Sequence, residues 1–128
     1  MLHLSKNLVA ISWTTLTLLF SCASAEDFPI TWFPGGGYED RTAVVGDKVI
    51  FNYGAGAHNV FLHPTGNCDE TGSTWVGDAP PTEYTFTEAG TFTFACQIGN
   101  HCSGGQIITF VVSEASAGNQ IDIAWSNQ

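Results

Sequence analysis

The sequence predicts an all-β domain, an antiparallel sandwich or barrel built from short strands, and two observations lead to that class. Apolar residues alternate at period two along several short runs, whereas a helical period of 3.6 is almost absent. Clusters of Gly, Pro, Asn and Asp, which favour turns, separate these runs at short intervals. Many short strands joined by frequent turns are typical of antiparallel sandwiches and barrels.

Four runs carry the alternation, and we expect strands at 48–53, 58–62, 91–96 and 106–112. In the second run Val60 and Leu62 form the apolar face, which places His58 inward and His63 outward. The inward residues of the other runs are Val49, Phe51 and Tyr53, then Phe92, Phe94 and Cys96, then Gln106, Ile108, Phe110 and Val112. The turn clusters are PGGG (34–37), VGD (45–47), GAGA (54–57), PTGN (64–67), GDAPP (77–81), EAG (88–90) and SGG (103–105). The last segment, 114–128, is expected to be one more edge strand or a tail.

The first 25 residues predict a secretory signal peptide. Lys6 precedes an apolar run at 8–20, and Ala23 and Ala25 occupy the small-residue positions of a cleavage site. An uncleaved anchor helix would need ~20 apolar residues, more than this run holds. A lipoprotein signal ending at Cys22 is the other alternative, and Phe20 fits it poorly. We therefore expect cleavage after Ala25, secretion, and a single domain over 26–113.

The mature chain is strongly acidic. Cleavage removes Lys6 and leaves two cations, Arg41 and Lys48, against 12 acidic residues, for a formal charge of −10. This negative charge argues against nucleic-acid binding. The absence of a further apolar segment argues against membrane insertion. No transmembrane or lipid anchor is expected at the C-terminus. A basic protein partner, or simple solubility, accounts for the charge.

The mature chain has an odd number of cysteines, so one of them has no disulfide partner within the chain. Cys22 departs with the leader, so three cysteines remain in the mature chain. In an oxidising compartment an odd number indicates one disulfide and one sulfur available for another role. If Cys96 is that sulfur, Cys68 and Cys102 pair and close a long loop, which contributes about 3 to 4 kcal/mol. A disulfide between Cys96 and either of the others, with an idle third thiol, is an equal alternative on counting alone.

The histidines favour a metal site over an idle thiol. A lone inward histidine is more often a hydrogen-bonded core residue than a ligand. His58 is not alone, because the segment CQIGNHCSGGQ (96–106) contains further potential metal ligands. That segment offers the Cys96 thiolate, the His101 imidazole and the Gln106 amide oxygen. Two imidazoles, one thiolate and a weak axial donor form the set that holds blue copper. Zinc sites more usually contain paired Cys-x-x-Cys ligands, which this chain lacks.

Two segments, VGDKVIFNYGAGAHNV (45–60) and GTFTFACQIGNHCSGGQ (90–106), resemble the phytocyanins, a cupredoxin family of secreted blue copper proteins. The resemblance covers most of residues 40–113, and its core is Cys-x4-His-Cys-x3-Gln with a distant His-Asn-Val. Two parts depart from the family: 27–41 has no clear copy of its Gly-Gly and Trp pattern, and the tail after Ser113 is not its Pro/Ser-rich linker.

The resemblance implies a cupredoxin-like Greek-key sandwich or barrel of about seven to eight strands over 26–113. It also implies one type 1 copper ion with Gln106 as axial ligand, where most cupredoxins have methionine and the stellacyanin branch has glutamine. His63 matches no ligand. The implied equatorial ligands are His58, Cys96 and His101, and the implied disulfide joins Cys68 and Cys102.

The function that follows from these ligands is one-electron transfer by Cu(I)/Cu(II) cycling. A hard amide oxygen from Gln106 favours Cu(II), so we expect a lower potential than a methionine version would have. The family resemblance suggests the His101 edge as the electron's exit, within small neighbours that include Gly104 and Gly105. Enzyme activity is not expected, because three mature histidines cannot supply further copper centres. The alternatives are extracellular copper binding or storage and a non-redox signalling module. We expect a monomer that acts with a small redox partner, a class that includes basic proteins.

Overall fold

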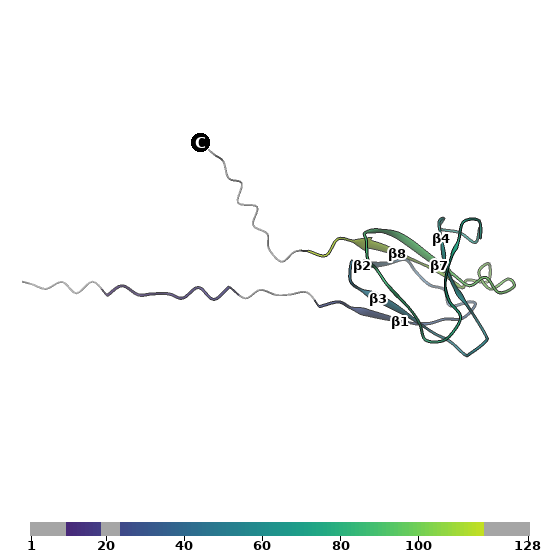
Figure 1. Ribbon diagram of the computed structural model, residues 1–128, viewed down its shortest axis with the longest axis horizontal. Helices are drawn as coiled ribbons and strands as arrows, with labels where there is room; N and C mark the ends of the chain where they lie inside the picture. The colour runs from purple at the N-terminus through teal and green to yellow at the C-terminus, as the bar shows by residue number, and fades with distance from the viewer. Residues whose placement is uncertain (1–9, 19–23, 117–128) are drawn as a thin grey trace, which may run out of the picture.

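Eight strands in the described part of the chain form a sandwich of two sheets (Figure 1). The computed structural model describes residues 10–18 and 24–116, and these residues contain strands and no helix. The strands are β1 (Asp27–Thr31), β2 (Arg41–Val44), β3 (Lys48–Asn52), β4 (Val60–His63), β5 (Thr74–Gly77), β6 (Thr82–Thr85), β7 (Gly90–Ala95) and β8 (Ile107–Ser113). The prediction of an all-β fold with seven to eight strands is confirmed over this part of the chain.

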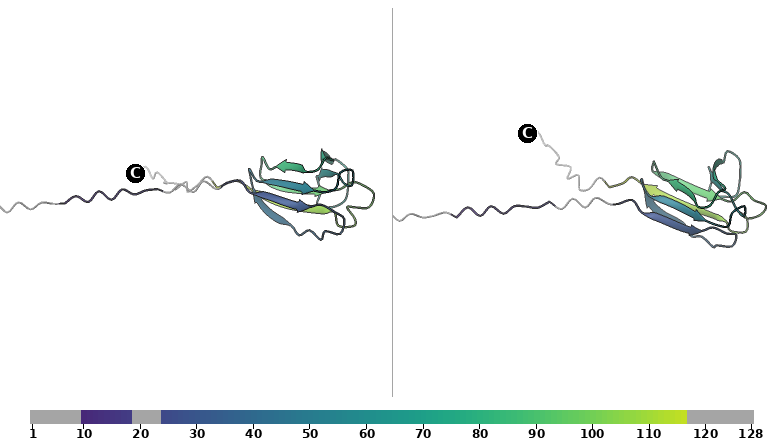
Figure 2. Two further views of the ribbon diagram at one scale, coloured as in Figure 1. Left: turned by 90° about the horizontal axis from the view of Figure 1, so that it is seen from below. Right: turned by 60° about the horizontal axis from the view of Figure 1, so that its bottom comes forward.

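The sheets have three and five strands. The smaller sheet has the order β1-β3-β6, and the larger has the order β2-β8-β7-β4-β5. The other two views show these strands in two layers that face each other (Figure 2). Apolar side chains from both sheets meet between the layers, including Val49 and Phe51 from β3 and Phe92 and Phe94 from β7. Burial of these faces is the dominant stabilising term of such a sandwich.

Two strand pairs depart from the antiparallel arrangement that the sequence suggested. β1 pairs with β3 in parallel, and β2 pairs with β8 in parallel, while the remaining pairs are antiparallel. The chain crosses from β1 in one sheet to β2 in the other and then returns to β3. Parallel neighbours cannot be joined by a tight hairpin and need a crossover connection of this kind. Side-chain alternation reports which face is buried and carries no information about strand direction.

The core is aromatic and follows the predicted alternation. Phe94 is fully buried, and its ring lies 5.2 Å from that of Phe51 and 6.2 Å from those of Phe86 and Phe110. Edge-on and tilted contacts of this kind add to the stabilisation from buried area. Each of the inward positions predicted for the runs at 91–96 and 106–112 is buried. The period-two pattern therefore identified the core-facing side of β7 and β8 correctly.

The run at 58–62 differs from its prediction in two respects. The strand begins at Val60, so His58 lies in the preceding loop. His63 pairs with Thr93, a residue between the inward Phe92 and Phe94, and so lies on the outer face of the large sheet as expected. It is nevertheless only 3% exposed. Asn67 and Ser73, from the segment between β4 and β5, belong to the hydrogen-bond network around it, which alternation alone could not indicate.

The predicted signal peptide and C-terminal strand fall largely outside the described residues. Residues 1–9 and 19–23 of the leader and residues 117–128 of the tail, including IDIAW, are not described. Residues 10–18 form neither helix nor strand. Among the described ranges, no helix has the length and apolar character needed to span a membrane.

Candidate metal centre

Two loops at one end of the sandwich bring the predicted ligands together. The loop from β3 to β4 carries His58, and the loop from β7 to β8 carries the other three. Cys96 follows directly after β7, Gln106 directly precedes β8, and His101 lies in the turn between them. Because β7 and β8 are neighbours in the sheet, their ends hold Cys96 and Gln106 close together: the Cys96 amide donates to the Gln106 carbonyl at 3.1 Å.

Three donor atoms converge in this place. The Nδ1 atoms of His58 and His101 lie 3.2 Å apart, and Cys96 Sγ lies 3.6 Å from His101 Nδ1. One potential ligand atom from each of the three residues lies within 4.8 Å of the other two. Within residues 10–18 and 24–116, this is the one group of three or more His, Cys, Asp or Glu side chains close enough to bind a metal ion. His63, which was not expected to be a ligand, is not part of it.

The surroundings of His58 favour the form of its imidazole that binds a metal. Burial, and then the neighbouring His101 imidazole, lower the pKa of His58 below its ordinary value. The neutral imidazole, which has a free lone pair on nitrogen, therefore persists to lower pH. Cys96 is fully buried and forms no disulfide, so its sulfur remains available as a ligand.

Gln106 provides an independent test of whether the site fits a metal. Its side chain is fully buried, yet neither Oε1 nor Nε2 has a hydrogen-bond partner in the protein. A buried amide without partners costs about 1 to 3 kcal/mol, so native proteins rarely leave one in this state. A metal ion that accepts the Oε1 lone pair removes the part of that cost that falls on Oε1. The orphaned amide beside two imidazoles and a thiol fits a copper ion with a weak axial donor.

Backbone contacts shape the ligand loop. The Gln106 amide donates to the His101 carbonyl at 2.9 Å, which folds the loop back on itself. A Cβ on Gly104 would lie 3.2 Å from the Asn100 carbonyl oxygen and 3.4 Å from that of His101. Gly105 has φ of +103°, in a region that side chains rarely adopt. The turn itself therefore favours glycine at these two positions.

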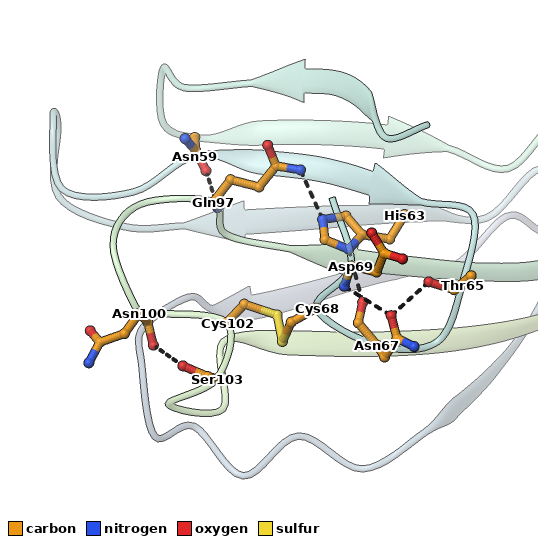
Figure 3. The surroundings of a disulfide bond; sticks show 10 residues. All are labelled: Asn59, His63, Thr65, Asn67, Cys68, Asp69, Gln97, Asn100, Cys102 and Ser103. Atoms are coloured by element: carbon orange, nitrogen blue, oxygen red, sulfur yellow. Dashed lines mark hydrogen bonds between the residues drawn. A yellow bond between two sulfur atoms is a disulfide. The ribbon is translucent and has the colours of Figure 1, made fainter. Parts of the chain in front are cut away.

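A disulfide joins the ligand loop to the segment after β4. Cys68 and Cys102 are bonded, with their Cα atoms 5.8 Å apart (Figure 3). Cys102 directly follows His101 in the sequence and is 9% exposed. The pairing leaves Cys96 as the free thiol, so the alternative disulfides that cysteine counting left open are not formed.

Sequence analysis missed the residues that tie the two ligand loops together. The Gln97 amide donates to Asn59 Oδ1 at 2.7 Å, which links the residue after Cys96 to the residue after His58. The Trp32 indole donates to the Asn59 carbonyl at 3.1 Å. Asn59 was visible beside His58 in the His-Asn-Val motif, but nothing local indicated its partner 38 positions away.

The comparisons with known proteins agree with this geometry. The plastocyanin-like domain family matches residues 37–106, more than half of the chain. Cucumber peeling cupredoxin of Cucumis sativus is 33% identical over 103 residues, which cover 77% of this chain and 72% of the cucumber protein. A blue copper protein of Pisum sativum is 34% identical over 97 residues, which cover 66% of this chain and 49% of the pea protein. This chain therefore spans about half the length of the pea relative.

Solved structures support the fold. Cucumber stellacyanin superimposes with a TM-score of 0.57 at 24% identity, over 73% of this chain and 99% of that one. This likeness establishes the cupredoxin-like arrangement of strands. The family match and the cucumber relative show that the chain belongs to the phytocyanin family of plastocyanin-like blue copper proteins.

Proposed function

We propose that this protein is a one-electron carrier that holds a single type 1 copper ion between His58, Cys96, His101 and Gln106. The observation that carries the proposal is the convergence of two imidazole nitrogens and one thiol within 4.8 Å, beside a buried amide that has no partner. A bound copper ion supplies the redox chemistry by exchanging one electron between Cu(II) and Cu(I). The protein's own residues bind the ion, orient the ligands around it and shield it from solvent.

The three strong donors have complementary chemistry. The Cys96 thiolate is a soft ligand that favours the reduced ion, and imidazoles suit the oxidised one. Both oxidation states must share nearly one geometry if electron exchange is to be fast. The β7–β8 pairing, the Gln97–Asn59 hydrogen bond and the disulfide hold the ligand loops from different sides. A site held in this way requires little rearrangement when the electron arrives or leaves.

Gln106 is proposed as the axial ligand that lowers the potential. Its Oε1 is a harder donor than the thioether of methionine and therefore stabilises Cu(II) relative to Cu(I). The side chain is fully buried and unpaired, which supports this role for the amide. The axial donor is one of the levers by which a blue copper site sets its potential.

Electron transfer without catalysis is the proposed activity. His58, Cys96, His101 and Gln106 would hold the ion with four protein donors, an arrangement that would offer no position to a substrate. His101 is partly exposed, whereas Cys96 is fully buried, which supports the His101 edge as the electron's route to a partner. The formal charge of −9 for the whole chain favours a cationic partner, and we propose a small basic redox protein or reagent. Secretion after cleavage at Ala25, and a monomeric state, are part of the same proposal.

Copper loading of the purified protein tests the proposal. Cu(II) should bind at one ion per chain and produce an intense visible charge-transfer band from the Cys96 thiolate. In Cys96→Ser that band should vanish, while far-ultraviolet circular dichroism reports an intact β fold. Persistence of the colour in this variant would assign the metal to other residues.

Stopped-flow mixing with a small cationic redox reagent tests the activity itself. A carrier should exchange its electron rapidly, and the rate should fall as salt screens the acidic surface. Exchange that takes many seconds would favour copper storage over electron transfer. Rates that are indifferent to ionic strength would count against a cationic partner.

A further inference from the structure

Beneath the segment that joins β4 to β5 lies a buried polar network that is not part of the ligand set. It centres on His63, which is 3% exposed on the outer face of β4. One ring nitrogen, Nδ1, lies 2.9 Å from the Asn67 carbonyl oxygen, and the other, Nε2, lies 3.0 Å from Gln97 Nε2 (Figure 3). Gln97 Nε2 also lies 2.8 Å from Ser73 Oγ.

The chemistry of the partners decides the form of the histidine. A backbone carbonyl can only accept, so His63 Nδ1 must carry the proton and donate to Asn67. An amide nitrogen can only donate, so His63 Nε2 must accept from Gln97. Both contacts are satisfied by the neutral imidazole protonated on Nδ1. The opposite orientation of the Gln97 amide would place its oxygen against Nε2 and would need a proton on that nitrogen as well, so the neutral Nδ1 tautomer belongs to the orientation seen here.

Gln97 connects that network to the metal centre. It directly follows Cys96 in the sequence, and its backbone amide donates to Asn59 Oδ1 at 2.7 Å. Its side chain is held from the opposite side by His63 and Ser73. The residue beside the central thiolate is therefore fixed through both its backbone and its side chain. At the far end of the network, Asn67 adjoins Cys68 of the disulfide.

We propose that His63 is a positioning residue for the metal centre, which acts through the Gln97 side chain to hold the backbone that carries Cys96. The inference rests on the proposed function, because the centre that it serves is the copper site. Partners outside the ligand set orient ligands in metalloproteins, and their loss typically costs about 10- to 100-fold in metal affinity or activity. Here the same network also couples the disulfide-bearing segment to Cys96.

Two substitutions at His63 separate the two contacts. In His63→Asn the side-chain amide stands in for Nδ1 and can still donate to the Asn67 carbonyl, but the contact with Gln97 is lost. In His63→Gln the longer side chain places an amide oxygen near the position of Nε2, where it can still accept from Gln97. Thr65→Ala is the matched control, because it removes the hydrogen bond from Thr65 Oγ1 to Asn67 Oδ1 in the same segment and leaves Gln97 alone.

The first readout uses the copper-free protein, so it does not depend on the metal. In wild type, nitrogen NMR should show the His63 tautomer with the proton on Nδ1, and the Gln97 backbone amide should exchange slowly with solvent. His63→Asn should raise that exchange rate by roughly two- to tenfold, the change that corresponds to one lost hydrogen bond. His63→Gln and Thr65→Ala should leave it near the wild-type rate. An unchanged rate in His63→Asn overturns the inference.

The second readout is the Cu(II) complex. His63→Asn should weaken Cu(II) binding by about tenfold or more in competition with a chelator, and should change the copper hyperfine splitting in electron paramagnetic resonance. His63→Gln and Thr65→Ala should retain both properties. If His63→Asn matches Thr65→Ala in both, or if His63→Gln loses as much as His63→Asn, the positioning role is wrong. Failure of wild type to bind Cu(II) would refute the proposed function, while the exchange measurement would still decide the Gln97 contact.

Discussion

Replacing both cysteines of the Cys68–Cys102 disulfide with alanine should destabilise the copper-free protein by about 4 kcal/mol. The bond joins residues 34 positions apart, and it holds the ligand loop at the position directly after His101. Without it, the unfolded chain regains the freedom of a long open loop. The folded state should retain its strands, because the network around His63 and the β7–β8 pairing still connect the same parts of the sandwich.

The magnitude follows from the size of the loop. In the chain-entropy treatment, closing about 34 residues removes about 12 to 13 cal/mol/K from the unfolded state, which is about 4 kcal/mol at room temperature. A domain of this size is typically stable by about 5–15 kcal/mol, so the loss is a large share of the total. The bridge is therefore a principal stabilising element of a small sandwich that has one core.

Urea unfolding followed by tryptophan fluorescence measures this loss. With a denaturant slope of about 1–3 kcal/mol per molar, the midpoint should fall by about 1 to 4 M in Cys68→Ala/Cys102→Ala. Ser103→Ala is the control, because it removes the hydrogen bond to the Asn100 carbonyl in the ligand loop but keeps the disulfide. A loss below about 1 kcal/mol at an unchanged slope would refute the loop-entropy reasoning.

Three further outcomes test other parts of the structure. Gln106→Met should raise the reduction potential measured by redox titration, because a thioether favours Cu(I) more than an amide oxygen does, and an unchanged or lower potential would remove Gln106 from the axial position. The lowered pKa of His58 means that the folded, copper-free protein binds fewer protons than the unfolded chain near and below the ordinary value of 6.5. Its free energy of unfolding should therefore fall as pH is lowered through that value and level off below the lowered pKa, and His58→Phe should lack this part of the slope. Phe94→Ala, at a fully buried position, should cost about 3 to 5 kcal/mol in urea unfolding, whereas Val111→Ala on an exposed face should stay within about 0.5 kcal/mol.

Much of the fold and the ligand set could be predicted from local sequence. The inward positions of β7 and β8, such as Phe94 and Phe110, follow from side-chain alternation because a strand has only two faces. The spacing of Cys96, His101 and Gln106 places three donors in one turn between neighbouring strands. These features depend on residues that lie close together in the chain, so they can be predicted from the sequence without the tertiary structure.

The tertiary structure decided what depends on distant partners. Alternation could not reveal that β1–β3 and β2–β8 run in parallel, because strand direction follows from the path between sheets. Nor could it reveal that Asn59 receives the Gln97 amide 38 positions away.

The burial of His63 shows the same division most clearly. Its outward face was predicted by the period of the strand, whereas the network around it joins Asn67 and Ser73, from the segment between β4 and β5, to Gln97 of the ligand loop, and only folding brings these two segments together. The sequence by itself determined the faces of the strands and the chemistry of the candidate ligands. The tertiary structure decided which of these groups are covered, paired and held, because hydrogen bonds and burial depend on proximity in space and not on spacing along the chain.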